Sequence, residues 1–460
     1  MRKFLAIVVL LGGAGGGGAW FWAGRQPGPT IEIRQPDRFI GQSTSLDLMV
    51  ESPDGQFAGV TVTLEQGDQS LEVFSLSQPT QGGDVRQESA ERIYIIRPVG
   101  KQDIPELQPG PARIVVRASR PVLYGVREAE SQLARDVEIR LEPPRVEVLS
   151  TLHYVNQGGA EFVVYRATPA DVDSGVRVGE QTYPGFPASG AGIQGDEAMR
   201  VAFFALTHDQ DLNAPISVYA RDPAGNEATT AFEHRAFPKQ FARSRIGIDD
   251  RLVQRVVPAI AATTPGMALA TAPEDLVNSF VRINSELRQL NTETIAAYAR
   301  DTSPDMLWRS AFQALGNASV EAGFADYRTY FYEGEEIDRQ VHLGFDLAVT
   351  QRIPILAAQA GVVFHAADLG IYGNCVIVDH GLGVQSLYAH LSSLDVSVGD
   401  RVEQGQPLGR SGMTGLAGGD HLHFTMLVNG YPVNPVEWWD PQWIQDRVLR
   451  KIAEASGSGM

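Results

Sequence analysis

Apolar and polar residues alternate over short stretches through the first half of this chain, and Gly, Pro, Asp and Gln residues separate the stretches. A period of two is typical of strands that bury one face. The pattern runs from Thr30 to about Pro143 and, beyond Pro143-Pro144, from Val146 to Phe232. Two tandem β-sandwiches account for such a succession of short strands.

The spacing of apolar residues changes to three and four from about residue 243, which predicts helices. A short helix is expected from Asp249 to Val256, stopped near Pro258 because proline interrupts the helical hydrogen bonds. Another is expected from Met306 to Leu315. These two short helices flank a longer one.

The longer helix is predicted to begin at the capping box Thr271-Ala-Pro-Glu274 and to run to about Ala299. Its apolar stripe consists of Leu276, Phe280, Ile283, Leu287 and Leu290. Two interpretations of the helical region remain open. It is either a plain connector between domains or a segment that lies against a catalytic cleft and gates it.

Short apolar runs with tight turns return between Gly361 and Val428 and predict an antiparallel β-sheet domain. An amphipathic tail follows Trp438-Trp439 and extends to Ala455. The final stretch, Ser456 to Met460, is expected to be disordered.

The N-terminus carries an uncharged stretch, Phe4 to Trp22, behind Met1-Arg2-Lys3. This length just suffices to cross a bilayer, and the positive start places the N-terminus in the cytoplasm. A cleaved signal peptide is the alternative, supported by the glycines that interrupt the stretch. Both interpretations export the remainder of the chain.

These patterns divide the chain into six parts. They are a signal anchor or signal peptide (1–28), a β-sandwich (29–143), a second β-sandwich (144–238), a helical connector (239–324), a C-terminal β domain (325–440) and a tail (441–460).

Composition narrows the range of functions. The 460 residues carry a formal charge of −17, and nucleic-acid binding depends on Lys and Arg, so we expect no nucleic-acid partner. Cys375 is the single cysteine, which excludes an intramolecular disulfide. It lies in an apolar run and is predicted to be a small core residue.

The candidate chemistry lies in the C-terminal β domain, which holds six of the nine histidines. In His421-Leu-His423 both imidazoles can face one point only if the segment is extended. His342 and Asp346 are four residues apart, and Gly344 between them allows close approach. Two imidazoles and a carboxylate, with a fourth position left to water, form the ligand set of a catalytic zinc site.

These residues resemble the lysostaphin-type (LytM-type) family of zinc metallopeptidases. The family motifs His-x-x-x-Asp, Tyr-x-His-Leu and His-x-His occur here in order, as His342 to Asp346, Tyr388 to Leu391, and His421 to His423. The resemblance covers about residues 332–439. It implies an antiparallel β domain of the duplicated hybrid motif type. Thr425 departs from the pattern, since relatives often carry Glu there.

The resemblance also implies roles for individual residues. His342, Asp346 and His423 would bind Zn²⁺, and His390 and His421 would be catalytic histidines outside the ligand set. One would deprotonate or orient the attacking water and the other would stabilise the oxyanion. Arg328, Tyr330 and Tyr332 precede the first ligand and are candidate substrate-binding residues; the alternative is a structural role.

A second, shorter resemblance concerns the upstream β region. The turn Asp222-Pro-Ala-Gly-Asn226 between two strands is similar to the last hairpin of many immunoglobulin-like extracellular domains. The expected fold class is therefore mostly β, with two immunoglobulin-like sandwiches, a helical connector and a C-terminal peptidase domain.

Two functional hypotheses follow. The first is a zinc endopeptidase that cleaves peptide cross-links of peptidoglycan, tethered to a bacterial inner membrane with its catalytic domain in the periplasm, or soluble there after signal cleavage. The second is a scaffold that activates other cell-wall hydrolases, with cell-wall or division proteins as partners. The intact metal-binding motifs favour the first.

Overall fold

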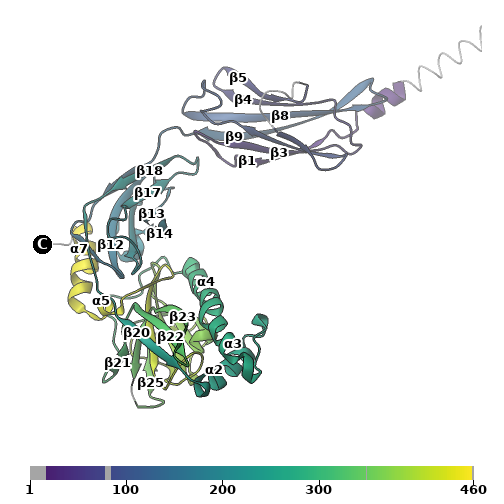
Figure 1. The fold of residues 1–460 in the computed structure, drawn as a ribbon. Coiled ribbons are helices and arrows are strands. Elements are labelled where there is room, and N and C mark those ends of the chain that lie inside the picture. The colour runs from purple at the N-terminus through teal and green to yellow at the C-terminus, as the bar shows by residue number, and fades with distance from the viewer. Residues whose placement is uncertain (1–16, 78–83, 349, 458–460) are drawn as a thin grey trace, which may run out of the picture. The chain divides into compact units, whose positions relative to one another are not determined.

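The computed structural model describes residues 17–77, 84–348 and 350–457, and most of their regular secondary structure is β-strand. The chain divides into two compact units, one made of residues 1–144 with 221–228 and the other of residues 145–220 with 229–460. The prediction of a mostly β chain is confirmed. Figure 1 gives the element labels used below.

The predicted apolar N-terminal segment lies largely outside the described residues, which begin at residue 17 within a short helical stretch. Among the helices that the structure describes, none is both long enough and apolar enough to span a bilayer.

The first unit contains a four-stranded sheet in the order β1-β3-β7-β6 and a five-stranded sheet in the order β2-β9-β8-β4-β5. Alternate side chains of both sheets meet in one apolar core. The strands are β1 Thr30–Gln35, β2 Phe39–Ile40, β3 Ser45–Glu51, β4 Gly59–Gln66, β5 Gln69–Ser75, β6 Asp84–Gln87, β7 Arg92–Pro98, β8 Gly110–Val122 and β9 Arg127–Ile139.

The second unit begins with two four-stranded sheets, β10-β12-β16-β15 and β14-β13-β17-β18, and a parallel pair, β11-β19. The strands of this region are β10 Arg145–Val148, β11 His153–Asn156, β12 Gly159–Thr168, β13 Asp173–Val178, β14 Gln181–Pro184, β15 Phe186–Pro187, β16 Met199–Leu206, β17 Ile216–Arg221, β18 Glu227–Ala231 and β19 His234–Phe237, with a 3₁₀ turn η1 at Ala188–Ala191.

A helical segment follows and is preceded by β20, the edge strand of a three-stranded sheet β20-β22-β23. Helices α2, α3 and α4 lie together on one side of this sheet (Figure 1), and their apolar side chains form a small core with it. The elements are β20 Arg243–Ile248, α2 Asp250–Thr263, η2 Pro265–Met267, η3 Pro273–Asp275, α3 Leu276–Arg282, η4 Ile283–Leu287, α4 Arg288–Tyr298 and η5 Ala299–Asp301.

The central sheet of the C-terminal region has the order β21-β24-β32-β28-β27-β26-β30, with β33 paired to β32, and a smaller sheet β25-β31-β29 lies beside it. Its elements are β21 Ser319–Ala322, β22 Asp326–Tyr332, β23 Glu335–His342, β24 Phe345–Ala348, β25 Pro354–Leu356, β26 Gly361–Asp368, η6 Gly370–Tyr372, β27 Asn374–Asp379, β28 Val384–Leu391, β29 Ser393–Leu394, β30 Arg401–Val402, β31 Pro407–Arg410, β32 Leu422–Val428 and β33 Tyr431–Val433.

Three details of the first two predicted helices are wrong. Helix α2 continues through Pro258, because Ile260 extends the buried face. The capping box does not form: the residue before the first turn is Ala272, and no side chain caps that turn. Leu290 is half exposed, because the π turn η4 inserts one residue into the helical repeat and Asn291 faces inward instead.

The third predicted helix, Met306 to Leu315, is an irregular segment. Its backbone N–H groups find partners elsewhere in the fold: Leu307 donates to His380 and Phe312 donates to Trp438. Because buried backbone donors must be paired, these bonds replace the helical ones. The buried side chains of Trp308 and Phe312 pack on Trp438, with ring centroids 5.8 and 5.4 Å from it.

The chain end forms α5 Pro435–Trp439, α6 Pro441–Ile444, η7 Gln445–Leu449 and α7 Arg450–Ala455. These helices pack against the strands that begin the second unit. The Nζ of Lys451 lies 2.8 Å from Glu161 Oε1 on β12, and both side chains are buried. Glu437 accepts hydrogen bonds from Asn156 and from the backbone N–H of Ala160, and burial raises the pKa of Glu437 to about 7.

Replacing Lys451 by Ala is expected to lower the free energy of unfolding of this unit by about 3–5 kcal/mol, because it leaves the Glu161 carboxylate buried without its cation. Urea denaturation followed by tryptophan fluorescence measures the loss. The double variant Glu161→Gln, Lys451→Met removes both charges and should lose much less. A single-variant loss below about 1 kcal/mol, the range of exposed pairs, would contradict the prediction.

Candidate active site

Three strands bring the predicted metal ligands together. His342 is the last residue of β23, Asp346 lies in β24 and His423 lies in β32, where it is the register partner of Asp346. The extended conformation predicted for His421 to His423 is confirmed, since β32 begins at Leu422 and His421 forms an isolated bridge with Gly412.

The donor atoms of these three residues form a tight triangle. His342 Nε2 lies 2.9 Å from Asp346 Oδ1 and 3.0 Å from His423 Nδ1, and His423 Nδ1 lies 2.9 Å from Asp346 Oδ1. Tetrahedral zinc with ligands at about 2.0–2.1 Å needs donor atoms about 3.3 Å apart. The triangle is therefore of the size that one divalent cation would fill.

The outward nitrogen of each imidazole fixes its tautomer. His342 Nδ1 lies 3.1 Å from the carbonyl oxygen of Gly323, to which it donates. Thr425 donates its hydroxyl proton to the carbonyl of Leu343 and so accepts from His423 Nε2, 3.0 Å away. Both inward nitrogens therefore present lone pairs, as in metal-binding histidines.

Three lone-pair donors within 3.0 Å of one another repel unless a cation or proton lies between them. The residues present thus fit a divalent metal. Thr425, the position that departs from the family pattern, orients His423.

Gly344 is required by this packing. A Cβ atom at this position would lie 2.5 Å from both His423 Nε2 and Thr425 Oγ1. The close approach predicted for Gly344 is confirmed. The connection between His342 and Asp346 is a short break between two strands and not one continuous strand, and it turns both donor atoms to the same point.

Asp346 is held as a carboxylate. Burial alone would raise its pKa, but hydrogen bonds from His342, His421 and His423, when protons and not a metal ion lie between these groups, outweigh burial and hold the pKa of Asp346 well below its usual range. Its second oxygen, Oδ2, accepts from Arg328 Nη2 at 3.0 Å. Arg328 also donates to Asp326 Oδ2 through Nε at 3.2 Å, so this guanidinium pairs with two carboxylates.

Replacing Arg328 by Met is expected to weaken zinc binding by about 10–100-fold, the usual effect of losing a group that orients a metal ligand. Competition with a chromophoric chelator measures the affinity. Arg245→Met is the matched control, since Arg245 lies exposed on neighbouring β20 and contacts the ring of Phe331 instead. Equal affinities of the Arg328 variant and the wild type would contradict the orienting role.

The two predicted catalytic histidines lie beside the triangle, with ring centroids 4.8 Å apart. His390 Nδ1 donates to the carbonyl of Thr414 at 2.8 Å, and His421 Nδ1 donates to the carbonyl of Gly419 at 2.9 Å. The Nε2 atom of His390 is therefore left with a lone pair. His421 Nε2 lies 3.4 Å from Asp346 Oδ1, to which it donates when the ring is protonated.

A bulge near the end of β28 directs His390 toward the site. The register between β27 and β28 shifts between Asn374 and Val376, and His390 adopts a φ of 62°, which is uncommon outside glycine. Burial, followed by the charges of His421 and His423, lowers the pKa of His390 well below its usual value. For His421, burial is outweighed by the hydrogen bond with Asp346, and its pKa is raised.

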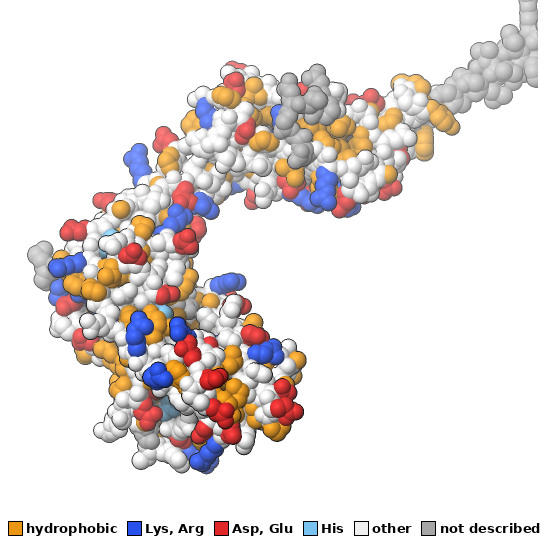
Figure 2. Space-filling view, viewed as in Figure 1, with side chains coloured by type: hydrophobic (Ala, Val, Ile, Leu, Met, Phe, Trp, Pro, Cys, Tyr) orange, Lys and Arg blue, Asp and Glu red, His pale blue; other side chains and the backbone are white. Residues whose placement is uncertain are grey.

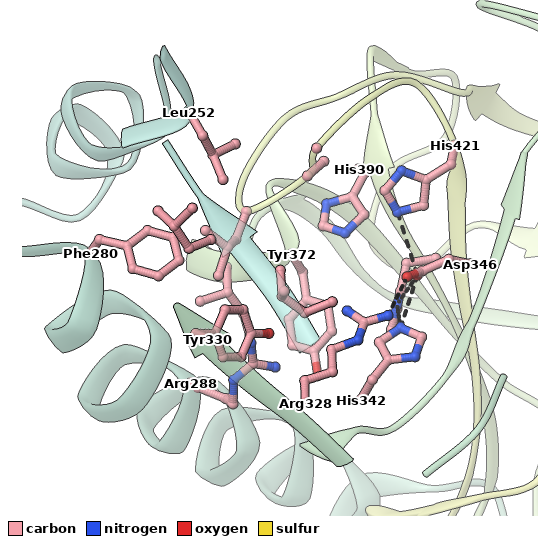
Figure 3. A pocket seen from close by; sticks show the side chains of 17 residues that line it. Leu252, Phe280, Arg288, Arg328, Tyr330, His342, Asp346, Tyr372, His390 and His421 are labelled. Atoms are coloured by element: carbon pink, nitrogen blue, oxygen red, sulfur yellow. Dashed lines mark hydrogen bonds and ion pairs between the residues drawn. The ribbon is translucent and has the colours of Figure 1, made fainter. Parts of the chain in front are cut away.

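A cavity of about 160 Å³ opens onto these five residues, each of which is less than a tenth exposed. In Figure 2 correspondingly small pale-blue areas of histidine reach the surface. Figure 3 shows the histidines and Asp346 along one wall and side chains of the helical segment, Leu252 and Phe280, along the other. Arg255 on α2 donates a hydrogen bond to the carbonyl of Ala417, a residue that lines the cavity, at 2.6 Å.

Of the three candidate substrate residues, Arg328 and Tyr330 line the cavity, whereas Tyr332 donates to Asp250 at the start of α2 and does not line it. One of the two interpretations of the helical segment placed it against a cleft, and its side chains do line this cavity. Sequence reasoning did not identify Arg288 or Tyr372 as site residues; the ring centroid of Tyr372 lies 5.6 Å from that of His423. The apolar stripe around Phe280 was the only sequence signal for that wall, and it also fits ordinary packing.

Comparison with known proteins agrees with this geometry. Residues 340–435 match Peptidase family M23 and form a domain of that family. The DD-carboxypeptidase/endopeptidase Mpg of Neisseria meningitidis serogroup B is 42% identical over 97 residues, which are 21% of this chain and 22% of that protein. The murein hydrolase activator EnvC of Escherichia coli is 35% identical over 106 residues, 23% of this chain and 25% of EnvC.

Among solved structures, a putative peptidase M23 from Pseudomonas aeruginosa is similar, with a TM-score of 0.38 and 21% identity over 62% of this chain and 94% of that chain. The chain spans about a fifth of the length of the first curated relatives that it matches.

Proposed function

We propose that this protein is a zinc-dependent endopeptidase that hydrolyses peptide cross-links of peptidoglycan. The observation that carries the proposal is the triangle of lone-pair donors from His342, Asp346 and His423, next to two imidazoles that are anchored through Nδ1. The relative from Neisseria, named as a DD-carboxypeptidase/endopeptidase, supports the endopeptidase reaction.

His342, Asp346 and His423 would hold the ion, which supplies Lewis acidity and lowers the pKa of water when bound. His390 and His421 then divide the remaining work. One takes the proton from the attacking water through Nε2, and the other donates toward the oxygen on which negative charge develops. The Nδ1 bonds to Thr414 and Gly419 leave the Nε2 of both rings for these roles. The base acts as a neutral imidazole, and the ring that donates toward the oxygen acts as an imidazolium.

The bond that we propose is the D-alanyl–meso-diaminopimelate cross-link of Gram-negative peptidoglycan, since an exported chain with one cysteine suits that setting. In this proposal residues 1–28 direct export, as an inner-membrane anchor or a cleaved signal peptide. The two N-terminal β regions act as immunoglobulin-like spacers that hold the peptidase domain in the periplasm, and the peptidase domain has the duplicated hybrid motif fold.

Digestion of purified sacculi with and without a chelator tests the proposal. We expect soluble muropeptides whose masses identify cleaved D-alanyl–diaminopimelate bonds, and we expect none when the chelator is present. Absence of any new product in the presence of zinc would overturn the enzymatic function.

The second candidate is an activator of other cell-wall hydrolases, as the similarity to EnvC suggests. Division or cell-wall proteins would then be its partners. Stimulation of a separate amidase by the full chain, with no product from the chain alone, would favour this function.

A further inference from the structure

Arg288 lies in the wall of the catalytic cavity, on the helical segment upstream of the peptidase domain. It is the first residue of α4, four residues after Asn284 and three before Asn291. Because both asparagines are buried, this spacing puts Arg288 on the inward side of the helix. Figure 3 shows it beside Tyr330, across the cavity from the histidines.

The Arg288 guanidinium is positioned but lacks a counterion. Its Nε donates to the carbonyl of Asn284 at 3.0 Å and its Nη2 donates to Asn284 Oδ1 at 2.6 Å. Asn284 is held in turn by Asp338, to which it donates at 2.7 Å. In the described part of the chain no carboxylate forms an ion pair with Arg288, and two of its five N–H donors are used.

The contrast with Arg328 is informative, since both arginines line the same cavity. Arg328 is occupied by the carboxylates of Asp326 and Asp346, at 3.2 and 3.0 Å. A partly buried cation without an anion costs desolvation energy that a bound anion would offset. Arg288, and not Arg328, is therefore the arginine that is free to receive an anionic group of a ligand.

The helix geometry points the same way. Residues Ile283–Leu287, directly before Arg288, form a π turn inside an otherwise α-helical segment. Such turns are rare and occur frequently at functional sites, because the extra residue rotates the following side chains around the helix axis. Here the extra residue determines the direction in which the side chains of Arg288 and Asn291 point from the helix axis.

We propose that Arg288 binds a free carboxylate of the peptide substrate, next to the scissile amide. This inference rests on the proposed function. In a D-alanyl–meso-diaminopimelate cross-link, the carbon that bears the scissile nitrogen also bears a free carboxylate. A guanidinium matches a carboxylate with two parallel hydrogen bonds. The apolar side chains of Leu252 and Phe280 line the same cavity.

Under this proposal the helical segment belongs to the substrate site, and it supplies specificity to a domain that already contains the metal ligands. Peptides in which this carboxylate is amidated would be poor ligands.

The test compares two probes on the full chain. One is N-acetyl-D-alanyl-meso-diaminopimelic acid, acylated at the D-centre nitrogen; the other carries a carboxamide in place of the carboxylate on that carbon. Calorimetric titration with a chelator present measures binding without hydrolysis. We expect the wild type to prefer the acid by about 10–100-fold, the range for a charge-assisted hydrogen bond.

Arg288→Gln should lose affinity for the acid, keep its affinity for the amide and so lose the preference. Arg288→Lys keeps the positive charge but lacks the two parallel N–H donors of a guanidinium, and it should retain part of the preference for the acid. Arg282→Gln is the matched control, because Arg282 pairs with Glu286 on the exposed side of the same helix and does not line the cavity. Thermal melting verifies that each variant is folded.

A wild type that does not distinguish the two probes would overturn the inference, as would an Arg288→Gln variant that keeps the preference or loses affinity for both probes equally. The outcome is separable from that of the proposed function. Hydrolysis of sacculi without a carboxylate preference removes this inference alone, and a preference without hydrolysis removes the proposed activity alone.

Discussion

The variant His423→Ala should lose metal binding and peptidoglycan hydrolysis together. His423 supplies one of three donor atoms that lie within 3.0 Å of one another, and the two that remain cannot hold the ion in a fixed geometry. We expect zinc affinity to fall by more than about 100-fold, beyond the effect of losing an outer partner. Chelator competition measures the affinity, and release of muropeptides from sacculi measures the activity.

His365→Ala is a suitable control for this variant. His365 lies in the same domain, contacts the hydroxyl of Tyr298 through Nδ1 at 3.0 Å and does not line the cavity. It should retain both zinc and activity. If the His423 variant still bound one zinc ion as tightly as the wild type, the ligand assignment would be wrong.

The variant His390→Ala should separate the two properties that His423→Ala removes together. His390 contacts none of the three donor atoms by hydrogen bond, and its Nε2 lone pair faces the cavity from a bulge in β28. We expect zinc to remain bound while the turnover number falls by about 10²–10⁴-fold, the usual contribution of a general acid or base.

Metal content by mass spectrometry and hydrolysis by muropeptide release are the two measurements. Comparison with His421→Ala assigns the roles. The variant that loses the acidic limb of the pH–rate profile lacks the base, since a general base must be deprotonated to act. Activity of His390→Ala equal to that of the wild type would exclude His390 from the reaction.

The metal triangle was predictable only in part from residue spacing, and the family resemblance supplied the rest. A His-x-His pair on one strand and a His-x-x-x-Asp pair around a glycine each constrain two donor atoms, and the strands that carry them are strongly apolar. Spacing alone does not join the two pairs or select His423 over His421. The resemblance to the family implied that choice, and the fold brings the donor atoms of His342, Asp346 and His423 close together.

The helical wall of the cavity was not predictable in the same way. An apolar stripe around Phe280 indicates that one face of the helix is buried, but it does not indicate which part of the protein that face packs against. The inward position of Arg288 depends on the π turn that precedes it, and no residue in Ile283–Leu287 marks such a turn. Arg328 was a candidate substrate residue with a structural role as the alternative. Its pairing with Asp346 connects β22 with β24, and periodicity does not determine how those strands lie.

The predicted helix around Trp308 is wrong for a further reason. Its apolar spacing is helical, yet its backbone donors bond to distant carbonyls such as those of His380 and Trp438. Local propensity was overridden by contacts that arise only after the C-terminal region has folded around it.

The buried pair of Lys451 with Glu161 also limits how far this protein can be shortened for laboratory work. A recombinant version trimmed to the family-matching stretch would discard the lysine, the strand that carries its glutamate and the Arg288 helix at once. Expression plasmids encoding about residues 145–457 preserve every one of those partners, and they are the sensible starting point for crystallisation or inhibitor screening.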